Sequence, residues 1–319
     1  MKILLVRAAF ILTAIAFPVC SAQPETAARD LSRFLATKGF ADVKMKRRFL
    51  NHLFVPVKIN EKPAALLVAT AAEATGIDRS SAARLGLTEQ KSNRHIRGSL
   101  GPSNEPLGMT NLELAIGAAN LINVRAAILN LTDLNKFKNQ SHLDGVLGLS
   151  EMQRFGAVLD CAGEKLYMRA GGNSRSASAE LAGFLASTGF VRVPMRLDNK
   201  NHRFAVNASI NGRRTEMVVD TGAFITCVTK QTAMTAGISL LSKSVLGSAA
   251  GGRREGLRIG RAKEIKVGDF RIEAPDVGIG NLWADSLGIE YVSLNNGIID
   301  VGGMALYLRR PDRASAKNR

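Results

Sequence analysis

The chain has 319 residues, of which 46% are hydrophobic and 22% are charged, and its formal net charge is +16. The length suits about two domains of ordinary size, and the apolar content excludes a disordered or fibrous protein. The positive charge predicts anionic partners such as acidic proteins, but the basic residues are scattered in short pairs without an aromatic stacking platform, so we expect no specific nucleic-acid partner.

The first 22 residues have the pattern of a secretory signal peptide. Lys2 and Arg7 lead into the apolar run 8–17, and small residues end at Ala22, after which we expect cleavage. Lipid modification of Cys20 is the alternative, although no small residue stands directly before it. No later apolar run is long enough to cross a bilayer, so we expect an exported protein, periplasmic or secreted, without a transmembrane segment.

The rest of the chain contains an internal repeat. Residues 33–40 return at 183–190, and the pair Asn51 and His52 returns as Asn201 and His202, 150 positions later in both cases. The spacing is 151 for the next two matches and 140 for the last strands: 82–87 with 233–238, 112–117 with 263–268, and 158–169 with 298–309. Since the spacing falls from 151 to 140, copy one carries about eleven extra residues, which we place around 132–143. Such self-similarity indicates two structural units of common ancestry.

The repeat defines two lobes. We place the first at 28–171 and the second at 179–311, with a linker at 172–178 and a basic tail at 312–319. In each lobe a short amphipathic helix precedes many short strands with period-two alternation, and a second helix is expected in mid-lobe, at 80–85 and 230–236. The predicted fold class is therefore mainly β, with two tandem β-barrel lobes.

An Asp-Thr-Gly turn distinguishes copy two. Three apolar residues, 217–219, lead directly into Asp220, Thr221 and Gly222, and a largely apolar segment follows. Burial of an ionised Asp destabilises a fold by several kcal/mol unless a partner compensates the charge. The turn is therefore either catalytic or a polar turn between two buried strands, and the tripeptide alone does not decide, because it is common in turns.

Glycine-containing elements follow the turn in a fixed order. They are a hairpin candidate with its tip at Ser248, Ala249, Ala250, Gly251 and Gly252, then Leu287 and Gly288 in an apolar element, and the final strand 297–300. This order resembles that of the retropepsin-like aspartic proteases over essentially both lobes, although Ser286 stands where the family has an apolar residue. The resemblance implies an acid-protease barrel in each lobe, a flap at 248–252, and support of the loop by Leu287 and Gly288.

The resemblance also implies a role for each residue of the turn. In this family, which is the usual example of the effect, two neighbouring carboxyls share one proton, so that one activates water while the other donates to the peptide carbonyl. Asp220 would be a catalytic carboxyl, Thr221 would anchor the loop on the opposite loop, and Gly222 would let the two backbones approach. The implied reaction is peptide-bond hydrolysis without a cofactor.

Copy one lacks this carboxyl. Ala69, Thr70 and Ala71 occupy the corresponding positions, 151 residues earlier. Thr70 keeps the anchoring hydroxyl, whereas Ala69 has no carboxyl and Ala71 replaces the glycine. If the two lobes pair within one chain, Asp220 faces Ala69 and its acid–base partner is missing.

Three functions are consistent with this sequence, and we favour the first. It is an aspartic endopeptidase in which two chains meet through lobe two, so that Asp220 of each completes the dyad. The second is a pseudoprotease whose lobes pair internally and bind extended peptides in the cleft between them without cutting. The third is an exported β-rich domain in which Asp220 is structural. The expected substrate is a peptide or protein, which the charge predicts to be acidic, and no His or Glu spacing indicates a metal site.

Overall fold

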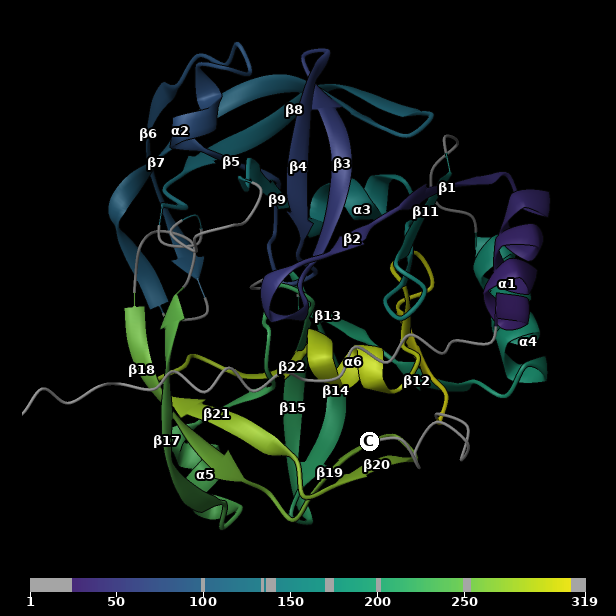
Figure 1. Ribbon diagram of the computed structural model, residues 1–319, viewed down its shortest axis with the longest axis vertical. Helices are drawn as coiled ribbons and strands as arrows, with labels where there is room; N and C mark the ends of the chain where they lie inside the picture. Colours follow the sequence, from purple (N-terminus) through teal and green to yellow (C-terminus); the bar gives the residue numbers. More distant parts are fainter. Residues whose placement is uncertain are drawn as a thin grey trace, which may run out of the picture.

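The computed structural model describes residues 25–98, 101–132, 135, 142–169, 175–198, 202–248 and 254–310. The predicted signal peptide, the predicted basic tail and residues 249–252 of the predicted flap lie outside these ranges. In the described ranges no helix is both long enough and apolar enough to cross a bilayer. The fold is mainly β, and two lobes of the same design follow each other along the chain, which confirms the predicted fold class (Figure 1).

The first lobe is a curled sheet preceded by a helix. Its elements are α1 (Glu25–Thr37), β1 (Phe40–Lys44), β2 (Lys46–Arg47), the 3₁₀ turn η1 (Phe49–Asn51), β3 (Leu53–Ile59), β4 (Lys62–Val68), β5 (Gly76–Asp78), α2 (Arg79–Ala82), β6 (Gln90–Gly98), β7 (Gly101–Ile116), β8 (Ala119–Leu129), β9 (Gly145–Leu147), α3 (Leu149–Arg154), β10 (Val158–Asp160) and β11 (Lys165–Arg169). The main sheet has the order β2-β3-β4-β9-β5-β8-β7-β6. Because β3 also pairs with β7, the sheet curls back on itself.

The second lobe repeats this design. Its elements are α4 (Arg175–Ser187), β12 (Val191–Pro194), β13 (Arg196–Asp198), β14 (Arg203–Ile210), β15 (Arg213–Asp220), β16 (Cys227–Thr229), α5 (Lys230–Thr235), β17 (Ser239–Ser248), β18 (Arg254–Arg261), β19 (Glu264–Val267), β20 (Phe270–Glu273), β21 (Asp276–Gly280), β22 (Asp285–Gly288), α6 (Ile289–Leu294), β23 (Ile298–Asp300) and β24 (Ala305–Leu308). The sheet order β17-β18-β21-β16-β22-β15-β14-β19-β20 matches lobe one, with β18 and β19 in place of β7, and β20 and β21 in place of β8. Strand β13, which pairs with β14, takes the place of β2. Helix α4 begins inside the segment predicted as the linker.

A third sheet joins the lobes. Its order is β1-β11-β10-β23-β24-β12, so each lobe contributes three strands and β10 pairs with β23 at the centre. Helices α1 and α4 lie side by side next to this sheet (Figure 1), and the rings of Phe34 and Phe184 stack with their centroids 4.4 Å apart. The two lobes are therefore fixed against each other by backbone pairing as well as by side-chain packing.

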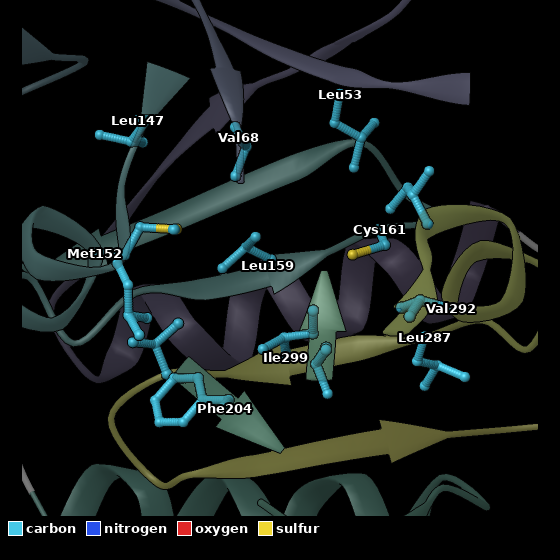
Figure 2. Packing of buried hydrophobic residues seen from close by; sticks show 14 of the residues in the cluster. Leu53, Val68, Leu147, Met152, Leu159, Cys161, Phe204, Leu287, Val292 and Ile299 are labelled. Carbon is cyan, nitrogen blue, oxygen red and sulfur yellow. The ribbon is translucent and has the colours of Figure 1, made fainter. Parts of the chain in front are cut away.

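The apolar core continues from one lobe into the other across the joining sheet. Successive side chains of a strand point to opposite faces, so Val158 packs in the cluster under α1 and α4, while Leu159 belongs to the main core. Leu159 pairs with Ile299 of β23, and neither side chain is exposed. Figure 2 shows them among side chains of both lobes, with Val68 on one side and Phe204 on the other.

A glycine supports each of the two loops that follow β4 and β15. A Cβ atom on Gly288 would lie 2.6 Å from the carbonyl carbon of Ile225 and 2.7 Å from the nitrogen of Thr226. The same atom on Gly148 of lobe one would lie 2.6 Å from the nitrogen of Thr75. Both positions therefore exclude any side chain, because the loop backbone occupies the space.

A half-buried glutamate completes the support in lobe two. One carboxylate oxygen of Glu290 accepts a hydrogen bond from the amide N–H of Thr226, and the other, buried, has no hydrogen-bond partner among the described residues. Burial raises the pKa of Glu290 to about 7, and the bonds from Thr226 lower it only in part. In lobe one, Glu151 accepts both from the N–H of Thr75, at 2.9 Å, and from its hydroxyl, at 2.5 Å.

This raised pKa predicts a pH dependence of stability. The unfolded chain ionises Glu290 near its ordinary value of 4.5, whereas the folded chain holds the proton until about pH 7. The free energy of unfolding should therefore fall as the pH rises between these values, by on the order of 2–3 kcal/mol from this group. Glu290→Gln cannot ionise and should lose less stability over the same interval in urea unfolding, while the exposed Glu61→Gln should follow the wild type. Parallel profiles for Glu290→Gln and the wild type would contradict this assignment.

Candidate active site

The loops that follow β4 and β15 meet between the lobes and are held by four hydrogen bonds. The amide N–H of Thr70 donates to Oγ1 of Thr221, and the N–H of Thr221 donates to Oγ1 of Thr70, each over 3.1 Å. The two hydroxyls donate to the opposite strand ends, Thr70 to the carbonyl of Val219 (2.6 Å) and Thr221 to that of Val68 (2.7 Å). Neither threonine is exposed. These four bonds, the threonine grip, form within one chain.

The threonine grip sets Asp220 opposite Ala69. Asp220 ends β15 and is partly exposed, whereas Ala69 directly follows β4 and is buried. A Cβ atom on Gly222 would lie 3.0 Å from Cβ of Ala69 and 3.1 Å from Oδ1 of Asp220, so these two atoms are at most about 6 Å apart. A methyl group therefore occupies the place where the resemblance implies a second carboxyl.

Asp220 is an isolated carboxyl. Its Oδ1 accepts a hydrogen bond from the N–H of Gly222 over 2.9 Å. Burial raises the pKa of Asp220 above its ordinary value, while the N–H groups of Gly222 and Ala223 and the charge of Arg203 lower it in part. Within the described ranges, no second carboxyl is among the groups that shift this pKa. The coupled titration of two carboxyls that the shared-proton mechanism uses is therefore missing.

An arginine from the neighbouring strand lies beside Asp220. The register of β14 and β15 pairs Ala205 with Val218, and its continuation by two residues sets Arg203 next to Asp220 on the same face of the sheet. The guanidinium carbon of Arg203 lies 4.3 Å from the ring centroid of Trp283, over the face of the indole. Both side chains are partly exposed. Neither Arg203 nor Trp283 is among the site residues that the sequence predicted.

A histidine takes the equivalent position in lobe one. The register of β3 and β4 pairs Phe54 with Leu67 and, continued by two residues, sets His52 next to Ala69. His52 reaches across to lobe two, where its Nε2 lies 3.0 Å from the carbonyl oxygen of Gly222. The structural counterpart of His52 is therefore Arg203, 151 positions later, and not His202, as the match at 150 suggested. The spacing of 151 in the neighbouring matches, applied to His52, would have identified Arg203 from the sequence.

The lobe-one side of the meeting point is apolar. Ala69 belongs to a buried cluster whose other members are Phe54, Leu67, Leu129, Leu131, Leu143 and Val146. Strand register places Ala205, Val218 and Ser286 of lobe two where lobe one has Phe54, Leu67 and Val146. Leu131 directly precedes the predicted extra segment and Leu143 ends it. The side chain of Asn135 accepts from the N–H of Leu143 (2.8 Å) and donates to its carbonyl (3.1 Å). Leu131 and Leu143 therefore pack in the same cluster as Ala69, the lobe-one counterpart of Asp220.

The remaining predicted site residues have different surroundings. Ala71 follows Thr70 in the lobe-one loop, and Leu287 is fully buried in β22, directly before Gly288. Ser248 ends β17, and the other four predicted flap residues, 249–252, lie outside the described residues. Lobe one has a corresponding hairpin, β6–β7, which the sequence did not single out, and both hairpins lie on the same side of the molecule in Figure 1. We call β6–β7 and β17–β18 the two flap hairpins.

We use the name interlobe site for His52, Ala69, Arg203, Asp220 and Trp283. All of these side chains except that of Ala69 are partly exposed, and they include one carboxyl and two basic groups. In the part of the chain that the structure describes, no three His, Cys, Asp or Glu side chains are grouped so that they could hold a metal ion. The interlobe site can therefore bind polar and charged groups, but its described residues do not include the acid–base pair of the hydrolytic mechanism.

Comparison with known proteins identifies the family of this chain. A family model described as aspartyl protease matches residues 55–150 and 206–298, one region in each lobe and together more than half of the chain. No curated protein matches the chain. Among solved structures, an aspartic proteinase from Irpex lacteus is similar at 13% sequence identity with a TM-score of 0.49, over 88% of this chain and 100% of that one. The chain belongs to the aspartyl protease family, with one retropepsin-like copy in each lobe.

Proposed function

We propose that this protein is a catalytically inactive member of its family, which binds extended peptides at the interlobe site without hydrolysing them. The observation that carries the proposal is the threonine grip, because it pairs the two loops within one chain and so gives Asp220 the methyl group of Ala69 as its neighbour. Hydrolysis by this mechanism needs one carboxyl to activate water and another to donate a proton. A lone Asp220 supplies one of the two functions.

Peptide binding is supported by the flap hairpins. Strands β6 and β17 are the terminal strands of their sheets, as far as the chain is described. A terminal strand presents unpaired N–H and carbonyl groups, to which an extended peptide can add as a further strand. An extended peptide held in this way would pass over the partly exposed side chains of Asp220 and Arg203.

The endopeptidase built from two chains, which the sequence favoured, requires a different arrangement. Asp220 of one chain would have to face Asp220 of another, so Thr221 would have to exchange Thr70 for Thr221 of the second chain. Four buried hydrogen bonds and the pairing of β10 with β23 oppose this exchange. We therefore rank the pseudoprotease above the two-chain endopeptidase.

The proposal is tested by mass, binding and turnover measured on one preparation. The protein from Gln23 onward should be a monomer by light scattering, should bind unstructured peptides in fluorescence anisotropy, and should release no fragments from strongly acidic to neutral pH. Asp220→Asn should still bind, because no chemistry depends on the carboxyl. A dimer that releases fragments, and loses this activity in Asp220→Asn, would overturn the proposal in favour of the endopeptidase.

The threonine grip itself gives a second test. Thr221→Val removes the hydroxyl, so the N–H of Thr70 and the carbonyl of Val68 lose their partners in a buried place, which should lower the free energy of unfolding by about 2–5 kcal/mol. Thr221→Ser keeps the hydroxyl and should lose about 1 kcal/mol. Because the grip forms within one chain, the midpoint of thermal unfolding should not depend on protein concentration. A midpoint that rises with concentration in the wild type but not in Thr221→Val would place the grip between two chains.

A further inference from the structure

We propose that the interlobe site selects peptides that carry a carboxylate, and that Arg203, held against Trp283, is the group that binds it. This inference rests on the proposed peptide binding and adds the chemical class of the ligand. Its source is either the side chain of an acidic residue or the terminal carboxylate of the peptide, and both present the same planar group.

Arg203 lies where a ligand over Asp220 would reach it. It begins β14 on the sheet face that carries Asp220, so a ligand lying over Asp220 also meets the guanidinium group. The ring of Trp283, 4.3 Å away, supports the flat guanidinium from one face. An arginine supported in this way keeps its N–H groups in a plane, where they match the two oxygens of a carboxylate.

The interlobe site has fewer carboxyls than the site that the family mechanism uses. The family mechanism uses two carboxyls, which together carry a negative charge that repels an acidic ligand. Here one carboxyl is replaced by Ala69, and Arg203 and His52 stand at matching positions beside the two loops. The interlobe site therefore has one carboxyl fewer than the family's pair, and the strand register places one further acid, Asp198 of β13, next to Arg203. Burial also raises the pKa of Asp220, which favours the neutral form of that acid.

The flap hairpins carry basic side chains. Among the side chains that the structure describes, β6 contains Lys91, β17 contains Lys243, β18 contains Arg258 and Arg261, and none of the three strands contains an acidic one. Positive charge on the terminal strands raises the local concentration of acidic peptides and speeds their association, and added salt should weaken this effect.

The lobe-one side offers no equivalent subsite. Phe54, Leu67 and Val146 form a buried apolar surface around Ala69, and Leu143 stands in lobe one where Trp283 stands in lobe two. Leu143 is buried in that cluster, whereas Trp283 is partly exposed beneath Arg203. Recognition of a carboxylate is therefore confined to the lobe-two half of the interlobe site.

The test uses one unstructured, fluorescently labelled peptide in three versions. The reference has a central Gln and an amidated C-terminus, the second replaces Gln by Glu, and the third keeps Gln but has a free terminal carboxylate. At low salt, the version that carries the recognised carboxylate should bind about tenfold more tightly than the reference, as expected for a charge-assisted hydrogen-bonded pair. The version that gains affinity identifies the source of the carboxylate.

Variants connect this preference to Arg203. Arg203→Gln should abolish the tenfold preference, and Arg203→Lys should retain part of it. The matched control is Arg213→Gln, which removes one positive charge from the opposite face of β15 and should keep the full preference. Asp220→Asn should increase the affinity for the acidic peptide, since it removes one carboxyl that competes for Arg203. If Arg203→Gln does not fold, Trp283→Leu should reduce the preference by removing the support of the guanidinium.

Two outcomes overturn the inference and are distinguishable. Equal affinity for all three peptide versions, or a preference that survives in Arg203→Gln, overturns the role of Arg203 and leaves peptide binding intact. Failure of every version to bind overturns the proposed function and this inference with it.

Discussion

Two buried threonines determine how this molecule is put together. Thr70 and Thr221 exchange hydrogen bonds with each other and with the strand ends Val68 and Val219, so the N–H and hydroxyl groups of both threonines and the two strand-end carbonyls are satisfied by the opposite lobe. The cost of leaving such groups unpaired in a buried place makes partial separation of the loops unfavourable. The pairing of β10 with β23 acts in the same direction. Both features keep Asp220 facing its own chain.

The two copies have kept the supporting parts and diverged at the surface. Gly148 and Gly288 pack against the loops in the same way. The N–H groups of Thr75 and Thr226 each donate to a glutamate carboxylate. On the exposed side, lobe one has Ala69 in an apolar cluster, whereas lobe two has a carboxyl beside an arginine. A scaffold that still holds the loops, combined with a site that has lost one carboxyl, fits a binding function better than hydrolysis by the shared-proton mechanism.

The sequence predicted the architecture because the evidence for it is local or repeated. Strand alternation, the spacing of 150 and 151 residues and the Asp-Thr-Gly turn identified the fold class, the two lobes and the correspondence of Ala69 with Asp220. The correspondence of Arg203 with His52 depends on strand register, which gives a spacing of 151. The sequence match of Asn51 and His52 with Asn201 and His202 has a spacing of 150, so it is one residue out of register. The raised pKa of Glu290 depends on how tightly α6 packs against the loop, which no sequence pattern encodes. The choice between pairing within a chain and between chains is a competition of free energies, and it too cannot be read from the motif.

Asp220 faces Ala69 of its own chain, and we propose that peptides bind there uncut. The most direct measurement is a crystal structure of the protein from Gln23 onward with an extended peptide that contains a glutamate. We expect an intact peptide across the interlobe site, with the threonine grip closed within one chain and the glutamate on Arg203. Two chains whose Asp220 loops face each other, or a peptide cut over Asp220, would contradict it.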